Sequence, residues 1–192
     1  MKHLAVLLSA VLAIANLCAQ TPEAAVKRYW QAACYRENTF ADHITNDFKA
    51  FFKDKNYSGK ELIQMISEHN ELIDAVRKDD FRRAYTLFMK SMKRTSQAKN
   101  VKITPADQIN QKNQDQFMAQ MKQLTADLPA KHEIALNKSL KITTVKVQGD
   151  TATVQISCTD IFKKNRLHIL TLVKSNGTFR VREHRELPQE EK

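Results

Sequence analysis

Two hydrophobic periodicities divide the chain. Up to about residue 130, apolar side chains recur at spacings of three and four, which is typical of helices with one buried face. From Leu140 onward they alternate with polar side chains, as in half-buried strands. Helices followed by an antiparallel sheet predict an α+β fold. We therefore expect N-terminal helices packed on a C-terminal four-stranded antiparallel meander, with a helical insertion at 57–130.

The first helix is predicted to begin after Thr21, whose hydroxyl can cap it ahead of a proline. Tyr29, Trp30 and Cys34 follow at the spacing of one apolar helical face. A shorter helix is expected around 46–52, where three phenylalanines lie close together.

The insertion is predicted to hold three longer helices. Ser58 and Glu61 form a capping box that opens the first of them. The second spans about 79–94 and is amphipathic, with a basic face opposite an aromatic one. The third begins near Thr104, is rich in Gln and Asn in its first half, and is expected to end at Pro129.

The meander is predicted from alternation and turn residues. An Asn-Gly pair between the last two strands is a strong hairpin signal. In the last strand Phe179 and Val181 point inward, and regular alternation then places His184 beside Arg180 and Arg182 on the other face. This row suits an anion, but a solvent-exposed sheet face is the favoured interpretation. The four predicted strands are at 140–147, 151–158, 166–174 and 178–185.

The N-terminus has the organisation of an export signal. A short basic start precedes an apolar run at 4–15, which is too short to span a bilayer as a helix. Cleavage is expected after Ala19, with Ala15 as the alternative. Lipid anchoring at Cys18 is less favoured, because Leu17 stands where the lipoprotein pattern has a small residue. We expect an exported protein, periplasmic or secreted.

The composition suits one globular domain. Hydrophobic residues make up 42% and charged residues 27%, which is enough apolar material for a core. Only 3 Gly and 4 Pro occur, which argues against collagen-like or linker architectures. The expected organisation is a signal peptide at 1–19, a single domain at 20–187 and a polar tail at 188–192.

The net charge of +10 is concentrated in the insertion. Such a surface attracts anionic lipid, an anionic polymer or an acidic protein, unless it is simply a solvated face. Nucleic acid is not expected, because no recognition motif occurs. The candidate surface residues lie on the amphipathic helix and are Arg82, Arg83, Lys90, Lys93 and Arg94.

Two cysteines follow the signal, Cys34 and Cys158. If the first helix packs on the sheet, both lie at that interface. They are candidates for a disulfide in an oxidising compartment, or for two buried thiols.

The motifs resemble the nuclear-transport-factor-2-like (cystatin-like cone) superfamily, and in particular its exported bacterial members of unknown function. The resemblance is carried by the Thr-Pro-Glu helix at 21–33, by Gly-Asp-Thr-Ala-Thr-Val at 149–154 and by a Gly-aromatic hairpin at 172–179. The insertion at 57–130 departs from the family pattern. The resemblance implies a cone-shaped fold with a cavity between the helix and the sheet, used by enzymes, ligand carriers or dimer interfaces.

Enzymes of this family place Asp, His or Tyr in the cavity. The resemblance therefore implies His43, Asp42 and Tyr29 as weak catalytic candidates, with loop and cap chemistry as the alternative. No phosphate loop, zinc-protease helix or nucleophile elbow occurs, and no metal or cofactor is expected.

Our leading hypothesis is an exported, non-enzymatic binding or interaction module. Tyr29 and Trp30 would line a cavity for a small apolar ligand, and the basic helix would face an anionic partner. One alternative is a cavity enzyme of the dehydratase or isomerase type. Another is a structural protein that forms a homodimer through the sheet, because the third strand is apolar on both faces.

Overall fold

The computed structural model describes residues 21–52, 55–94, 104–132, 138–160 and 163–188. The predicted signal peptide, Cys18 and the tail beyond residue 188 lie outside these residues. The chain divides into two compact units. Unit 1 runs up to Ile63 and resumes at His132, and unit 2 is Gln64–Lys131.

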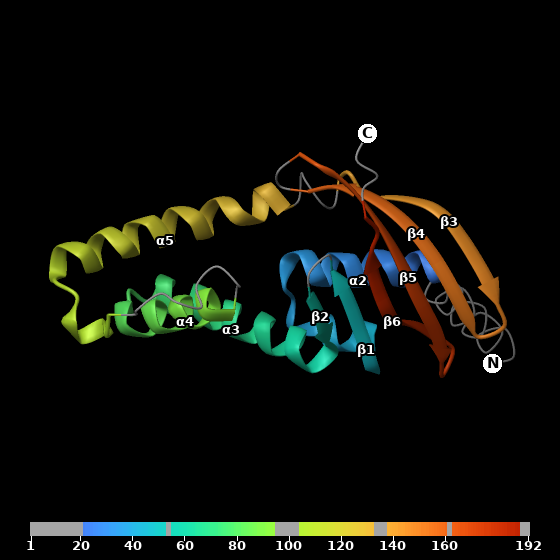
Figure 1. Cartoon of the computed structure of the whole chain (residues 1–192), viewed down its shortest axis with the longest axis horizontal. Helices are drawn as coiled ribbons and strands as arrows, with labels where there is room; N and C mark the ends of the chain where they lie inside the picture. Colours follow the sequence, from blue (N-terminus) through green and yellow to red (C-terminus); the bar gives the residue numbers. More distant parts are fainter. Residues whose placement is uncertain (1–20, 53–54, 95–103, 133–137, 161–162, 189–192) are drawn as a thin grey trace, which may run out of the picture. The chain divides into compact units, whose positions relative to one another are not determined.

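Unit 1 is an α+β layer structure in which α2 (Pro22–Tyr35) covers one face of a curved sheet (Figure 1). The hydroxyl of Thr21 accepts a hydrogen bond from the backbone N–H of Ala24 at 3.2 Å, so the predicted N-cap is present. A short 3-10 helix, η1 (Asn38–His43), leads from α2 into the sheet. The α+β class expected from the sequence is therefore confirmed.

The sheet has six strands in the order β2-β1-β6-β5-β4-β3. All neighbouring pairs are antiparallel except β1 and β6, which are parallel. The prediction of a four-stranded meander thus describes β3 to β6 and misses two strands. The strands are β1 (Ile44–Phe52), β2 (Lys55–Ser58), β3 (Lys141–Gln148), β4 (Thr151–Thr159), β5 (Asn165–Ser175) and β6 (Thr178–Glu186).

The helix predicted around 46–52 is wrong, because this segment is strand β1. Phe48 and Ala50 are both buried, which is the spacing of two that a strand requires. Pairing with β6 on one side and β2 on the other satisfies the backbone groups of β1. Tertiary pairing therefore overrides the local helical signal.

The solvent-exposed position predicted for His184 is also wrong. The pairing of β6 with β5 shifts register between Thr171 and Leu172, and this irregularity breaks the alternation. Val181 faces inward, and three positions later His184 faces inward as well, with 4% of its surface exposed.

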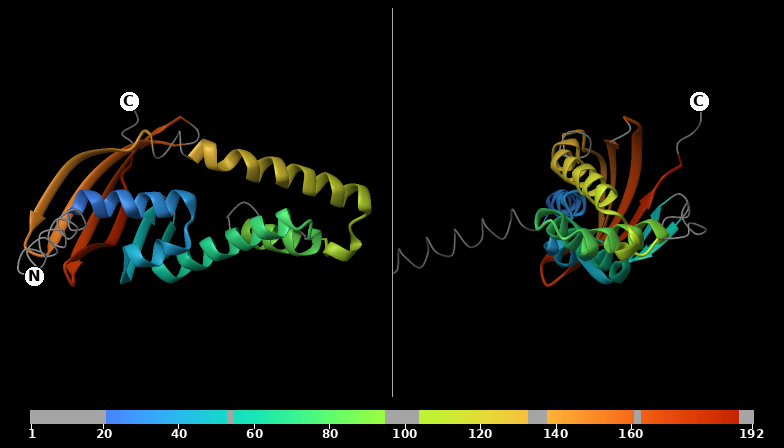
Figure 2. Two further views of the ribbon diagram at one scale, coloured as in Figure 1. Left: turned by 180° about the vertical axis from the view of Figure 1, so that it is seen from behind. Right: turned by 90° about the vertical axis from the view of Figure 1, so that its left-hand side faces the viewer.

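Unit 2 is helical. Helix α3 (Gly59–Arg77) starts in unit 1 at the predicted capping box: the Ser58 N–H donates to the Glu61 carboxylate at 2.7 Å. It is followed by α4 (Phe81–Arg94), the short η3 (Ala106–Gln108) and α5 (Gln111–His132). Both views in Figure 2 show these helices as ribbons.

Helix α5 passes through Pro129, where the sequence predicted its end. A proline inside a helix removes one hydrogen bond and clashes with the preceding turn, and α5 extends only to His132 beyond it. The core of unit 2 is made by Leu72, Ala75, Val76, Ala84, Met118 and Met121. No helix within the described ranges is long and apolar enough to cross a membrane.

Two leucines of β5 test which face of the sheet is the core. Leu170 is fully buried, whereas Leu167 is 39% exposed. Leu170→Ala is expected to lower the free energy of unfolding by about 2–5 kcal/mol, because it leaves a cavity in the core. Leu167→Ala, as the matched control, is expected to cost less than about 1 kcal/mol. Chemical denaturation of both variants measures this, and equal losses would contradict the assigned core face.

Candidate functional site

Four acid–base side chains form a hydrogen-bonded row inside unit 1. The Tyr29 hydroxyl on α2 lies 2.8 Å from Nδ1 of His184 on β6. Nε2 of His184 lies 3.1 Å from Nδ1 of His168 on β5. Nε2 of His168 lies 3.7 Å from Sγ of Cys158 on β4. One helix and three strands thus each contribute one member, which we call the Tyr-His-His-Cys row.

Aromatic rings enclose the row. The Trp30 ring lies 5.2 Å from the His168 ring and 5.7 Å from the His184 ring, measured between centroids. Phe52 on β1 contacts His184 edge to face at 5.1 Å. The two histidines are the buried polar residues of the described chain, and this apolar shell separates them from water.

The row can be satisfied without any charge. In one arrangement Tyr29 donates to His184, His184 donates to His168, and His168 donates to the Cys158 sulfur. In the reverse arrangement the Cys158 thiol donates to His168, His168 donates to His184, and His184 donates to the Tyr29 hydroxyl. A neutral imidazole carries one donor and one acceptor nitrogen, so both arrangements use every nitrogen.

Burial keeps the groups of the row neutral. It lowers the pKa of His168 to about 4 and holds the pKa of His184 well below its usual range. It raises the pKa of the Tyr29 hydroxyl far above its usual range and that of the Cys158 thiol to about 11. At neutral pH the row therefore consists of two neutral imidazoles, a phenol and a thiol.

This chemistry is unfavourable for catalysis. A cysteine nucleophile attacks as the thiolate, which a nearby cation stabilises. Here the carboxylates of Asp160 and Glu186 add to burial in raising the pKa of Cys158. A general base is most effective when its pKa lies near the operating pH, and burial lowers the pKa of both histidines below neutral pH.

Cys34 and Cys158 are both buried and are free thiols, so the disulfide considered from the sequence is not formed. Burial, aided by the neighbouring Cys158, raises the pKa of Cys34 to about 12. The alternative of two buried thiols describes the structure.

Unlike the polar atoms of the row, the indole nitrogen of Trp30 is buried in this site without a hydrogen bond to any described residue. Trp30 is 5% exposed, and its Nε1 has no hydrogen-bond partner among the described residues. A buried donor without an acceptor costs about 1–3 kcal/mol, so this atom would gain from an acceptor.

The catalytic candidates are not brought together. Tyr29 is bonded to His184, whereas His43 is half-buried at the end of η1 and Asp42 beside it is exposed. Burial and the nearby Arg28 lower the pKa of His43. Among the described residues, no cluster of His, Cys, Asp or Glu is placed to hold a metal ion.

The basic face of α4 is partly neutralised within unit 2. Lys90 and Arg94 both contact the Glu68 carboxylate of α3, at 2.9 and 2.7 Å. Arg83 contacts Glu71 at 3.2 Å. Of the predicted anion-facing residues, the other two, Arg82 and Lys93, are exposed.

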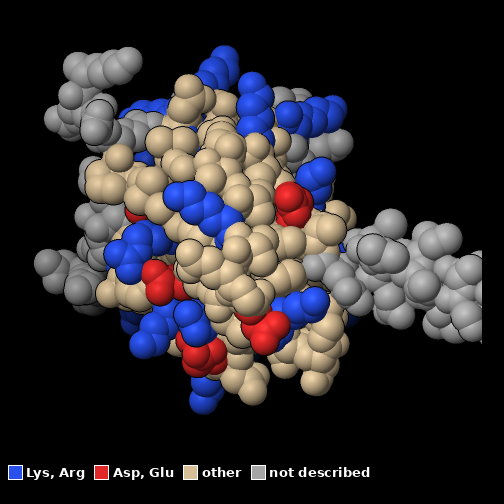
Figure 3. Space-filling model, turned by 90° about the vertical axis from the view of Figure 1, so that its right-hand side faces the viewer, with Lys and Arg blue, Asp and Glu red and all other residues tan. Residues whose placement is uncertain are grey.

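In unit 1 the charges are dispersed. Figure 3 shows the face on the side of β3 and β4, where Lys and Arg side chains and a smaller number of Asp and Glu side chains are scattered among uncharged residues.

Comparison with solved structures finds NTF2-like proteins, the family that the sequence motifs predicted. An NTF2-like protein of unknown function from Silicibacter pomeroyi DSS-3 is 14% identical, with a TM-score of 0.42 over 94% of this chain and 98% of that chain. An NTF2-like protein with a cystatin-like fold from Novosphingobium aromaticivorans is 12% identical, with a TM-score of 0.42 over 96% and 90%. A de novo designed protein with a curved β-sheet is 13% identical, with a TM-score of 0.41 over 88% and 100%.

At these identities and TM-scores, nothing about the site or its function follows from the neighbours. No protein-family model matches the chain. The search of curated proteins finds no match either.

The row makes the stability of unit 1 depend on pH. Both histidines are neutral when folded, but in the unfolded chain they bind protons near pH 6.5. Protons therefore favour the unfolded state as the pH falls from 6.5 toward 4. For His168 each pH unit in that window should cost roughly 1 kcal/mol, and His184 should add to the loss. His168→Gln keeps hydrogen-bonding capacity without titrating, and should clearly flatten the loss between pH 7.5 and 5.

His43→Gln is the matched control, since His43 is half-buried and outside the row. Because the pKa of His43 is also lowered, this variant should flatten the loss to some extent, and the row predicts a clearly larger flattening for His168→Gln. Urea unfolding at several pH values measures both variants. A wild-type stability that is constant from pH 7.5 to 5 would show that the histidines are not held neutral.

Proposed function

We propose that the chain is an exported, non-catalytic binding module, in which unit 1 is the scaffold and unit 2 carries the binding surface. The observation that carries this proposal is the Tyr-His-His-Cys row. Its acid–base groups are hydrogen-bonded to one another, neutral and enclosed by aromatic rings, so they act as a structural network and not as reacting groups.

Thiol reactivity tests this proposal. Iodoacetamide reacts with thiolates, so Cys34 and Cys158 should both be protected in the native protein at pH 7.5 and react rapidly in 6 M guanidinium. Peptide mass spectrometry reads the two cysteines separately, and Thr153→Cys provides an exposed thiol on β4 as a control. We expect native labelling of Cys158 to be at least about 100-fold slower than that of the control. Labelling of Cys158 faster than the control would indicate an activated nucleophile and would contradict a non-catalytic role.

Trp30 favours a second candidate function, the binding of a small apolar ligand within unit 1. Its buried N–H lacks an acceptor among the described residues, and Trp30 belongs to the buried hydrophobic core of unit 1. A ligand with an apolar body and one carbonyl oxygen would supply that acceptor.

The chain has 1 Trp, so its fluorescence reports on this position alone. A ketone such as 2-octanone should shift the emission of Trp30 saturably and raise the melting temperature. Trp30→Phe keeps an aromatic ring but removes the N–H, and should abolish the rise in melting temperature. An unmoved wild-type melting temperature at high ketone concentration would refute this candidate.

The proposal has two further parts, export of the chain and binding of an anionic partner, and the support for export is the stronger. The basic start and apolar run at 4–15 support export with cleavage after Ala19, which N-terminal sequencing of the exported protein would test. An anionic partner on α4 is less favoured, because Glu68 already binds Lys90 and Arg94.

A further inference from the structure

Unit 2 contains a pocket of about 330 Å³ that lies outside the row and outside the basic face of α4. This volume is within the range of small-molecule sites. Its lining comes from α4, η3, the segments flanking η3 and α5. The lining residues are Phe81, Tyr85, Thr104, Gln108, Ile109, Asn110, Asn113 and Phe117.

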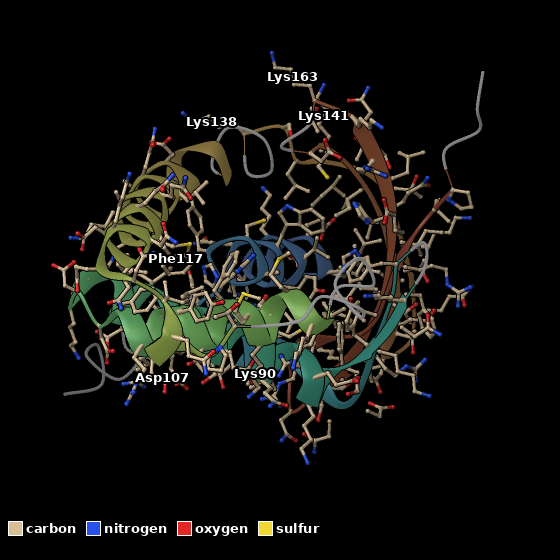
Figure 4. The ribbon with its side chains drawn as sticks, turned by 60° about the vertical axis from the view of Figure 1, so that its left-hand side comes forward. Lys90, Asp107, Phe117, Lys138, Lys141 and Lys163 are labelled. Atoms are coloured by element: carbon tan, nitrogen blue, oxygen red, sulfur yellow. The ribbon has the colours of Figure 1, made fainter. Side chains whose placement is uncertain are left out.

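Aromatic rings make the apolar part of the pocket. The Phe117 ring lies 5.7 Å from Phe81 and 5.5 Å from Tyr85, edge to face in both cases, and Phe81 stacks on Tyr85 at 5.5 Å. Phe117 projects from α5 toward the helices of the same unit, and Asp107 lies in η3 (Figure 4). The rings are half-buried, so part of each is available for contact.

Some polar groups of the lining are used by the fold. The Tyr85 hydroxyl donates to the backbone carbonyl of Thr104 at 3.2 Å. The Asn110 side-chain oxygen accepts from the Asn113 backbone N–H at 3.0 Å and caps α5. These bonds position the segment before α5 against α4.

Other polar groups of the lining are unused. Within the part of the chain that the structure describes, the side-chain amides of Gln108 and Asn113 form no hydrogen bond with another residue, and Asn113 bonds to Asn110 through its backbone N–H alone. Both are exposed, and each offers a carbonyl acceptor and an NH₂ donor. The Gln- and Asn-rich stretch seen in the sequence thus places free amides beside an aromatic wall.

We propose that this pocket binds a neutral carbohydrate unit, an inference that rests on the proposed role of the chain as a binding module. No charged residue is among the described lining residues, which disfavours an ionic ligand. The free amides disfavour a purely apolar ligand, because burying them unpaired is costly. A pyranose ring meets both conditions, since its C–H face packs on aromatic rings while its hydroxyls pair with amides.

An NMR titration of the full mature chain tests this inference. The probes are N-acetylglucosamine and, separately, methyl β-glucoside, each up to about 50 mM. We expect saturable shifts of the side-chain NH₂ signals of Asn113 and Gln108 and of the backbone amide of Phe117. The expected dissociation constant is on the order of millimolar, as for other ligands of this size.

Variants on α5 separate the pocket from the rest of the helix. Asn113→Ala removes one pair of hydrogen-bonding groups from an exposed position and should weaken binding by about tenfold. Gln123→Ala is the matched control, an exposed amide of the same helix outside the lining, and should leave binding unchanged. The folding of both variants is checked by their NMR spectra.

The absence of saturable shifts with both sugars would overturn the inference. So would shifts that Asn113→Ala leaves unchanged, or shifts caused by benzamide at the same concentration but not by the sugars. None of these outcomes changes the reactivity of Cys158 in unit 1, so failure of this inference is distinguishable from failure of the non-catalytic proposal.

Discussion

The need to pair a buried hydroxyl with a buried imidazole organises unit 1. Tyr29 and His184 are 155 positions apart in the chain, yet their side chains meet at 2.8 Å between α2 and β6. Neither group can be left unpaired in an apolar interior without a cost of about 1–3 kcal/mol. The bond therefore specifies where α2 lies on the sheet, beyond what the apolar contacts of Val26 and Trp30 require.

Burial also determines the protonation states of His168 and Cys158, and with them the chemistry of the row. A histidine beside a cysteine has the composition of a nucleophilic pair, but the aromatic shell removes the solvent that would stabilise an ion pair. His168 and Cys158 are thereby kept as a neutral imidazole and a neutral thiol. Composition and proximity indicate an active site only when the surroundings favour the charged forms, and here they favour the neutral ones.

Local signals in the sequence predicted the elements that depend on neighbouring residues. The caps at Thr21 and Ser58 and the alternation of β4 need no distant partner, and the structure contains them. Strand β1 and the inward position of His184 depend on pairing with β6 and on a shift of register, which no local pattern encodes. The row was missed for that reason. The pairing of Glu68 with the basic face of α4 likewise required two helices to be placed side by side.

His168 and His184 are neutral members of a closed hydrogen-bonded row. Side-chain ¹⁵N chemical shifts of the two imidazoles, followed from pH 7.5 to pH 5 in the folded protein, test this most directly. Each ring should carry one protonated and one unprotonated nitrogen throughout this range. Titration of either imidazole near pH 6.5, with both nitrogens becoming protonated, would contradict it.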